Sequence, residues 1–220
     1  VGSDAVTSVD GLANGLNVGI YADNLSNAVG SGLSNYAITY ANGGLAITPR
    51  SLTVTYTADA LRGVYGDAPT GLTGSYSFDG LIGGDMLSGT ASWTTSANAT
   101  SGVGAYAITG SGLSAGGNYV LTSRQAVANA VALTIAPRTI VVTADSASRD
   151  FGAPNPALTW TVGGLGLVNG DTLSGALATT AGPDSAIGDH EITRGDLAAS
   201  PNYAMSFVER NNYGLLESDR

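Results

Sequence analysis

Few residues of this chain could carry out chemistry, because it has one histidine and neither cysteine nor lysine. The histidine, His190, lies between Asp189 and Glu191, with Asp184 and Asp196 nearby, a composition that would suit a metal ion. On a strand, however, Asp189 and Glu191 would point to one face and His190 to the other. The matching position of an internal repeat, described below, holds a tyrosine. We therefore interpret this stretch as an ordinary exposed strand, and predict no catalytic residue, metal site or cofactor.

Three Gly-Asp pairs are the second group of candidates, at 66–67, 84–85 and 170–171. Their carboxylates could bind Ca²⁺ together with backbone carbonyls near module ends. No Asp-x-Asp-x-Asp loop accompanies them, and Gly followed by Asp is typical of tight turns. The turn interpretation is favoured, and these residues are assigned to a structural repeat signature. The signature consists of Tyr65, Gly66, Asp67, Gly84, Asp85, Phe151, Gly152, Gly170 and Asp171.

Aromatic side chains raise the question of a sugar-binding face. Tyr65 and Phe151 occupy matching repeat positions, which favours packing in a core. Trp93 and Trp160 do not match one another, so one of them could be exposed. We keep these two tryptophans as candidate interaction aromatics.

Charge and hydropathy argue against several partners. The 220 residues contain 17 acids and 8 bases, a net charge of −9. So few bases cannot neutralise nucleic-acid phosphates or hold an anionic membrane surface. No apolar run approaches the ~20 residues of a membrane-spanning helix. The lack of lysine also excludes Lys–Asn cross-links within the chain, so mechanical strength would come from strand ladders and core packing.

An internal repeat organises the whole chain. Its motifs recur in the same order and at nearly constant spacing, which is the mark of a repeat architecture. The matching pairs are Pro49-Arg50 with Pro137-Arg138, Tyr65-Gly66 with Phe151-Gly152, Gly84-Asp85 with Gly170-Asp171, and Asn118-Tyr119 with Asn202-Tyr203.

The repeat predicts three domains. Residues 1–49 match only the second half of the pattern, since Asn35-Tyr36 corresponds to Asn118-Tyr119. Residues 50–137 and 138–220 are complete β modules. Pro49 and Pro137 mark short linkers, because proline interrupts pairing between adjoining strands.

Within each module the apolar residues alternate. Leu52, Val54 and Tyr56 alternate with threonines, which predicts a half-buried strand. The predicted fold class is all-β: an elongated, Gly/Thr-rich array of small antiparallel modules. An Ig-like sandwich is one topology, and a β-grasp-like sheet is the alternative, in which the 165–171 turn would be a reduced helix. Further strands are predicted at 72–78, 87–95, 104–110, 118–124, 131–135, 157–162, 172–180, 187–193, 202–208 and 213–217.

The motifs as a set resemble the MBG-type modules of bacterial surface proteins, including filamentous-haemagglutinin-like exoproteins. The last module departs from the family by having Phe151-Gly152-Ala153 where the pattern has Tyr-Gly-Asp. The resemblance implies a secreted or cell-surface location, a spacer or adhesive role, and no catalytic residues. The residues that carry it are Thr53–Tyr56, Val64–Pro69, Gly83–Gly89, Gly104–Thr109, Asn118-Tyr119, Leu133–Pro137 and Gly166–Gly175.

Three functions remain open at this point. The first is a non-catalytic stalk or spacer of an adhesin, in which modules fold one by one. The second is a carbohydrate-binding module that contacts host or matrix glycans or proteins. The third is a subunit of an extracellular filament, because the partial module at 1–49 would leave open sheet edges for strands of neighbouring modules or of other copies.

Overall fold

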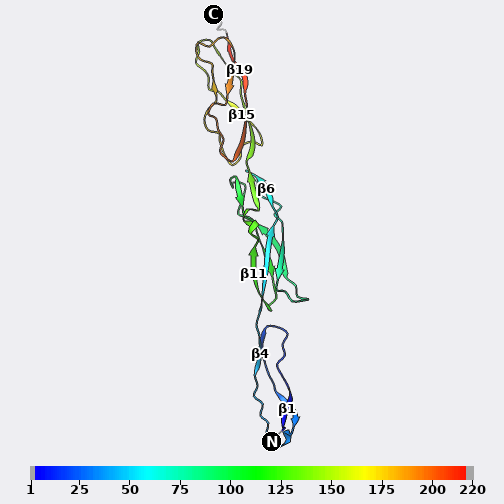
Figure 1. The fold of residues 1–220 in the computed structure, drawn as a ribbon. Helices are drawn as coiled ribbons and strands as arrows, with labels where there is room; N and C mark the ends of the chain where they lie inside the picture. The colour runs from blue at the N-terminus through cyan, green and yellow to red at the C-terminus, as the bar shows by residue number, and fades with distance from the viewer. Residues whose placement is uncertain (1–2, 217–220) are drawn as a thin grey trace. The chain divides into compact units, whose positions relative to one another are not determined.

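The computed structural model describes residues 3–216, and within them it is all-β (Figure 1). The tandem β modules predicted from the sequence are confirmed. No helix in these residues is long and apolar enough to cross a membrane. Residues 3–49 hold β1 (Ala5–Asp10), β2 (Gly19–Ala22), β3 (Ser26–Ser31), the 3-10 helix η1 (Leu33–Asn35) and β4 (Gly44–Ile47).

The two complete modules contain the remaining elements. The middle module has β5 (Arg50–Ala58), β6 (Leu61–Val64), β7 (Gly74–Asp79), β8 (Ser88–Thr94), β9 (Gly104–Tyr106), β10 (Thr109–Ser114), β11 (Tyr119–Gln125), the 3-10 helix η2 (Val127–Val131) and β12 (Leu133–Ala136). The last module has β13 (Arg138–Ala144), β14 (Ala147–Asp150), β15 (Trp160–Gly164), β16 (Ala178–Thr179), β17 (Gly188–Thr193), β18 (Tyr203–Val208) and β19 (Arg210–Leu216).

The chain divides into two compact units, and the division runs through the middle module. Each unit therefore contains one of the two proline junctions together with the strands around it. The first unit is Val1–Tyr56, Tyr76–Ser92 and Ser111–Gln125, and the second is Thr57–Ser75, Trp93–Gly110 and Ala126–Arg220.

The last module is built from two mixed sheets. One sheet has the order β15-β13-β18, and β13 pairs antiparallel with β15 and parallel with β18. The other has the order β14-β19-β17-β16, with a parallel pair between β14 and β19. Ile140 and Val142 of the first sheet and Ile192 of the second are fully buried in one core cluster. The module is thus a two-layered sandwich.

The middle module repeats this plan. Its sheets have the orders β11-β5-β7 and β6-β12-β9, together with the pair β10-β8. The pairs β5–β11 and β6–β12 are again parallel. Leu52, Val54 and Tyr56 of β5 are fully buried while the threonines between them are half-buried, so the predicted alternation is confirmed.

The parallel pairs differ from the purely antiparallel modules predicted above. Alternation specifies which face of a strand is buried but not the direction of its neighbour. The first and late strands of a module lie side by side only after a long connection, which permits parallel pairing. No strand was predicted at the short strands β6 and β14, at β1 and β3 of the N-terminal segment, or over most of β10. Of the strand predicted at 172–180, only Ala178–Thr179 form a strand, and Ser174 makes an isolated bridge to Ala198.

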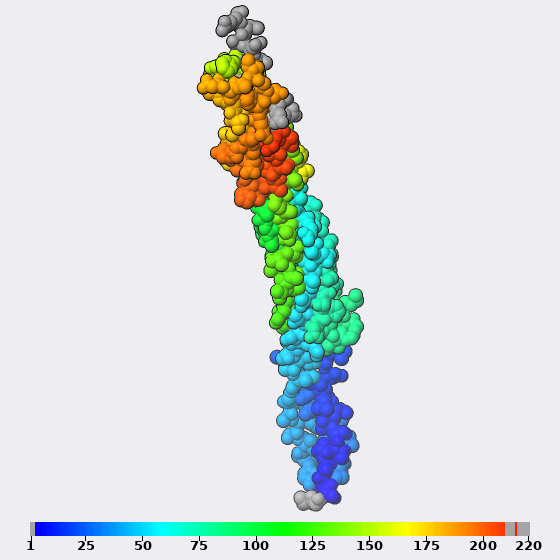
Figure 2. Space-filling view, turned by 45° about the horizontal axis from the view of Figure 1, so that its top comes forward, coloured from blue at the N-terminus to red at the C-terminus, as the bar shows by residue number. Residues whose placement is uncertain are grey.

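The N-terminal segment, residues 3–48, is the least packed part of the described chain. Its strands form two separate pairs, β1 with β3 and β2 with β4. None of its residues is buried. In the space-filling view, its dark-blue and light-blue chains leave a furrow between them (Figure 2). Leu45 of β4 is 39 % exposed, whereas its repeat counterpart Leu133 is completely buried.

Candidate functional site: the junctions between modules

At the Pro137 junction, repeat signature residues from two modules meet around one carboxylate. The hydroxyls of Tyr65 and Tyr203 both donate to Oδ2 of Asp171, at 2.9 and 2.8 Å. The two tyrosine rings pack edge to face with their centroids 5.4 Å apart. Both rings are buried. Tyr65 belongs to the middle module and the other two residues to the last, so this cluster fastens one module to the next.

An arginine at the start of the last module bridges the same junction. Through Nε and Nη2, Arg138 donates to the carbonyl of Leu165 in its own module, the latter at 2.8 Å. Through Nη1 it donates to the carbonyl of Tyr65 and to Oδ1 of Asp67 in the preceding module, at 3.2 and 3.1 Å. The carboxylate of Asp67 is largely exposed, so solvent screens this ion pair and it contributes little to stability.

A third contact uses the asparagine of the Asn-Tyr motif. The side-chain oxygen of Asn202 accepts from the backbone N–H of Val103 at 3.0 Å, and its carbonyl accepts from the N–H of Arg138 at 2.9 Å. One asparagine therefore joins the end of the middle module to the first strand of the last. Proline is the single residue between β12 and β13, so the chain passes directly from one module to the next.

Close packing at this junction requires glycine at position 66. Gly66 has φ +91°, a conformation that L side chains rarely adopt. A Cβ built on it would lie 2.5 Å from Cγ2 of Val168 in the last module. Gly152, the matching residue of the last module, also has a positive φ of +82°, but a Cβ there would meet no atom within 4 Å. The two glycines share a backbone conformation and differ in their surroundings.

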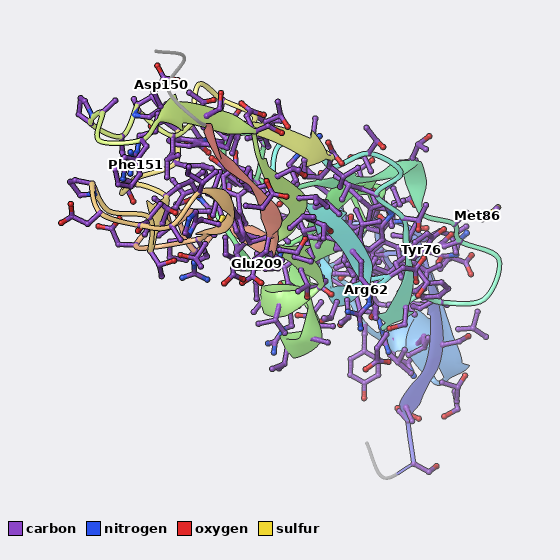
Figure 3. All side chains as sticks on the ribbon, turned by 90° about the horizontal axis from the view of Figure 1, so that it is seen from above. Arg62, Tyr76, Met86, Asp150, Phe151 and Glu209 are labelled. Atoms are coloured by element: carbon purple, nitrogen blue, oxygen red, sulfur yellow. The ribbon has the colours of Figure 1, made fainter. Side chains whose placement is uncertain are left out.

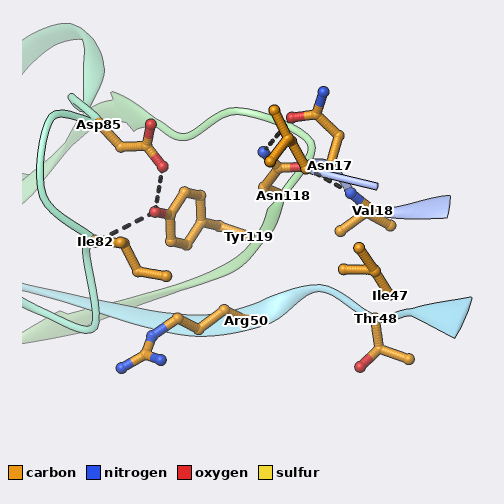
Figure 4. Close-up of a pocket in the computed structure, with 10 residues that line it drawn as sticks. Asn17, Val18, Ile47, Thr48, Arg50, Ile82, Asp85, Asn118 and Tyr119 are labelled. Carbon is orange, nitrogen blue, oxygen red and sulfur yellow. Dashed lines mark hydrogen bonds between the residues drawn. The ribbon is translucent and has the colours of Figure 1, made fainter. Parts of the chain in front are cut away.

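The Pro49 junction repeats two of these contacts with the matching residues. The hydroxyl of Tyr119 donates to Asp85 and accepts from the N–H of Ile82 (Figure 4). The side-chain oxygen of Asn118 accepts from the N–H of Val18 at 2.9 Å, as Asn202 does from Val103. The repetition at two separate junctions shows that the motifs encode a connection between modules.

The Pro49 junction lacks the Tyr-Gly-Asp turn that the Pro137 junction has. Arg50 donates from Nε to the carbonyl of Gly80 at 2.8 Å, but among residues 3–216 no Tyr-Gly-Asp turn lies against it. In its place is an open cavity of about 280 Å³ (Figure 4). The cavity is lined by Leu16, Asn17, Val18, Ile47, Thr48, Arg50, Ile82, Asp85, Asn118 and Tyr119.

The junction tyrosines are held protonated by their surroundings. The hydrogen bond to Asp85 raises the pKa of Tyr119 above its ordinary value of 10.0. Burial, with the nearby carboxylate of Asp171, raises the pKa of Tyr203. A protonated hydroxyl is what each carboxylate requires as a donor, so both contacts are complete at neutral pH.

The remaining predicted signature residues lie at turns. Gly84 and Gly170 have φ of +94° and +77°, and the Asp that follows each accepts a tyrosine hydroxyl. Met86, next to one of these pairs, lies on the exposed loop between β7 and β8 (Figure 3). Phe151, expected to pack as Tyr65 does, is instead 50 % exposed. Figure 3 labels Phe151 in the last module.

The tryptophans and the histidine lie away from these junction contacts. Trp93 and Trp160 are both half-buried and pack against the core cluster, so neither stands clear of its module. A role for them in ligand binding stays a prediction. His190 is half-buried, and its Nε2 lies 2.9 Å from the carbonyl of Ala186. Within residues 3–216 no three metal-ligating side chains gather.

The sequence identified the signature residues but not the residues of the neighbouring module that they contact. Arg138, Asn202 and Tyr203 were used only as markers of the repeat, although they make the junction contacts. A signal was present: they recur as Arg50, Asn118 and Tyr119, and polar residues that recur at fixed repeat positions report a recurring contact.

Two complete sandwiches joined through repeated polar contacts define a tandem β-repeat protein. The model of the MBG domain (YGX type) matches residues 54–128 and 140–211. These ranges make up more than half of the chain, which therefore belongs to the MBG domain family. MBG domains are structural domains that occur in surface proteins. The comparisons with curated proteins and with solved structures gave no match.

Proposed function

We propose that this chain is a non-catalytic spacer in the stalk of an extracellular bacterial adhesin, and that its repeat signature locks successive modules together. One observation carries the proposal: Tyr65, Asp171 and Tyr203, all at repeat positions, converge on a junction and not on a cleft. A spacer must keep its modules in register, and partly buried hydrogen bonds beside a shared core serve that purpose.

The shared core supports the same proposal. Buried apolar residues of the middle module, including Leu133 and Ile135, belong to one cluster with Ile140 and Val142 of the last module. A continuous core couples the folding of neighbouring repeats, as nearest-neighbour interfaces do in other repeat proteins. The two complete modules are covalently linked only through the backbone at Pro137, because the chain has no cysteine. Packing and hydrogen bonds must therefore hold them together.

The test measures how rigidly the Pro137 junction holds. The chain has no native cysteine, so Ala105→Cys and Asp189→Cys place spin labels at matching exposed positions of the two modules. We expect a narrow distribution of label–label distances, broadened by Asp171→Ala because both tyrosine hydroxyls lose their acceptor. Asp150→Ala, an exposed acid of the same module, is the matched control and should leave the distribution narrow. A broad distribution of label–label distances in the protein with its junction residues unchanged would refute the spacer function.

A second function, strand exchange between modules, is favoured by one specific observation. In the N-terminal segment, β4 pairs only with β2 among the described residues, whereas its counterpart β12 pairs on both sides. An open edge of this kind accepts a strand by β-augmentation.

A further inference from the structure

The first and last strands of the last module run side by side in the same direction. β13 pairs in parallel with β18 over six register pairs, and β14 pairs in parallel with β19 over four. Only Asp145 and Ser146 separate β13 from β14, and only Glu209 separates β18 from β19, with no turn at either place. The register slips by a single residue between the two pairings. Residues 138–150 and 203–216 therefore form one continuous parallel ribbon, which we call the terminal ribbon.

The direction of the terminal ribbon decides how it is loaded when the chain is pulled. Tension enters the module at Arg138, where the first strand begins, and leaves it at Leu216, where the last strand ends. In a parallel pair these two points lie at opposite ends of the ribbon. Pulling them apart slides one strand along the other, so the ladder hydrogen bonds are strained together. In an antiparallel pair both points would lie at the same end, and the bonds would open one after another.

Both strands of the terminal ribbon are also held on their other sides. β13 pairs antiparallel with β15 over five register pairs, and β19 pairs antiparallel with β17. Ile140 and Val142 of β13 are fully buried in the core. The first strand therefore cannot slide without straining a second ladder and exposing apolar side chains to water.

A buried arginine ties the second half of the ribbon to a loop outside it. Arg149 of β14 is 7 % exposed, and its Nε donates to the side-chain oxygen of Asn155 at 2.6 Å. Its Nη2 donates to the carbonyl of Gly182 at 2.5 Å. The side-chain amide of Asn155 donates in turn to the carbonyl of Ala181 at 2.8 Å. Hydrogen bonds from a charged donor are the stronger kind, so these contacts hold β14 against movement along its axis.

The middle module has the same arrangement of parallel strands. β5 pairs in parallel with β11 over seven register pairs, and β6 pairs in parallel with β12 over four. The 3-10 helix η2 lies between β11 and β12 in the sequence. Parallel pairing of the first and last strands thus recurs in both complete modules.

We propose that the terminal ribbon is a mechanical clamp. Tension along the chain loads its two strands in shear, and Arg149 anchors the first strand against sliding. A spacer between a cell and the surface to which it adheres is pulled at both ends. The clamp keeps the module folded under that load, and the property that it controls is the rate of forced unfolding.

The test pulls on the last module in two directions by single-molecule force spectroscopy of the whole chain. The chain has no native cysteine, so pairs of introduced cysteines fix the attachment points. Thr139→Cys with Ser218→Cys, a residue that follows β19 in the sequence, loads the ribbon along its strands. Thr139→Cys with Ala204→Cys opens the same ribbon from one end, because these two exposed residues lie opposite one another in β13 and β18.

The two directions should give different rupture forces. We expect the force along the strands to be at least about twice the force that opens the ribbon from its end, since the bonds then break together. Equal rupture forces, or a lower force along the strands, would overturn the proposal. This comparison needs no change in the core or at Arg149, so it does not depend on a variant that fails to fold.

A substitution tests the anchor. At constant force along the strands, Arg149→Met should shorten the lifetime of the folded module about tenfold or more, because hydrogen bonds of a charged group are lost. Arg194→Met is the matched control, since Arg194 is exposed and lies outside the ribbon. It should leave the lifetime unchanged. Equal lifetimes of the two variants would show that Arg149 does not anchor the ribbon.

The proposal rests on the spacer function, because a spacer is the part of an adhesin that transmits tension. The two tests fail separately. The spin labels report on the contact between two modules, whereas forced unfolding reports on the strands of one module. Narrow, Asp171-dependent distances with equal rupture forces in both directions would leave the spacer intact and remove only the clamp.

Discussion

At the scale of single residues, the tightest constraint is the contact of Gly66 with Val168. Gly66→Ala and Gly152→Ala both force alanine into a positive φ, at a cost of about 1–2 kcal/mol each. Only the first also drives a Cβ against Val168. We expect Gly66→Ala to lower the free energy of unfolding by about 1–3 kcal/mol more than Gly152→Ala does. Urea denaturation of the two variants measures the difference.

A double mutant separates the clash from the backbone cost. Val168→Ala removes the side chain that the new Cβ meets, so it should restore much of the stability lost in Gly66→Ala. If Val168→Ala has the same effect whether residue 66 is glycine or alanine, the contact between the two modules is not the cause.

The junction tyrosines predict a loss of stability at high pH. The pKa of Tyr203 is raised in the folded protein above the ordinary 10.0, so folding favours the protonated hydroxyl. Its contribution is complete below pH 10.0 and disappears as the pH rises through the higher folded pKa. Thermal unfolding followed from pH 8 upward should show this decline, and Tyr203→Phe should reduce it. An unchanged decline in that variant would assign the effect to other groups.

At the scale of elements, equivalent strands differ in how much they bury. Leu133→Ala removes a fully buried side chain from β12, so it should destabilise the protein by about 2–5 kcal/mol. Leu45→Ala makes the same change in β4, where the side chain is 39 % exposed, and should cost well under half as much. Chemical denaturation compares the two, and equal losses would mean that β4 is packed as β12 is.

At the scale of the whole molecule, stability should differ strongly along the chain. Residues 3–48 contain no buried residue, whereas β13 is paired on both sides and carries fully buried side chains. Local opening requires little free energy where few apolar contacts are lost. Amides of β2 and β4 should therefore exchange with solvent far faster than those of β13. Comparable protection, measured by mass spectrometry on the intact chain, would contradict this gradient.

Much of the fold was predictable from the sequence, because its signals are local. The alternation of Leu52, Val54 and Tyr56 predicted β5 and its buried face, and the collinear motifs predicted tandem all-β modules. The strands β6 and β14 escaped because each is four residues long and without regular alternation: β6 includes Gly63, and β14 carries the buried Arg149.

What the sequence by itself determined is the repeat: the order of its motifs, many of its strands, and the glycines, tyrosines and acids that recur. Only the tertiary structure decided which residues meet. Periodicity specifies a face and not a neighbour, so neither the parallel pairs nor the hydrogen bond between Tyr65 and Asp171, 106 positions apart, could be deduced from it. That long-range contact shows that the Tyr-Gly-Asp turn also connects two modules.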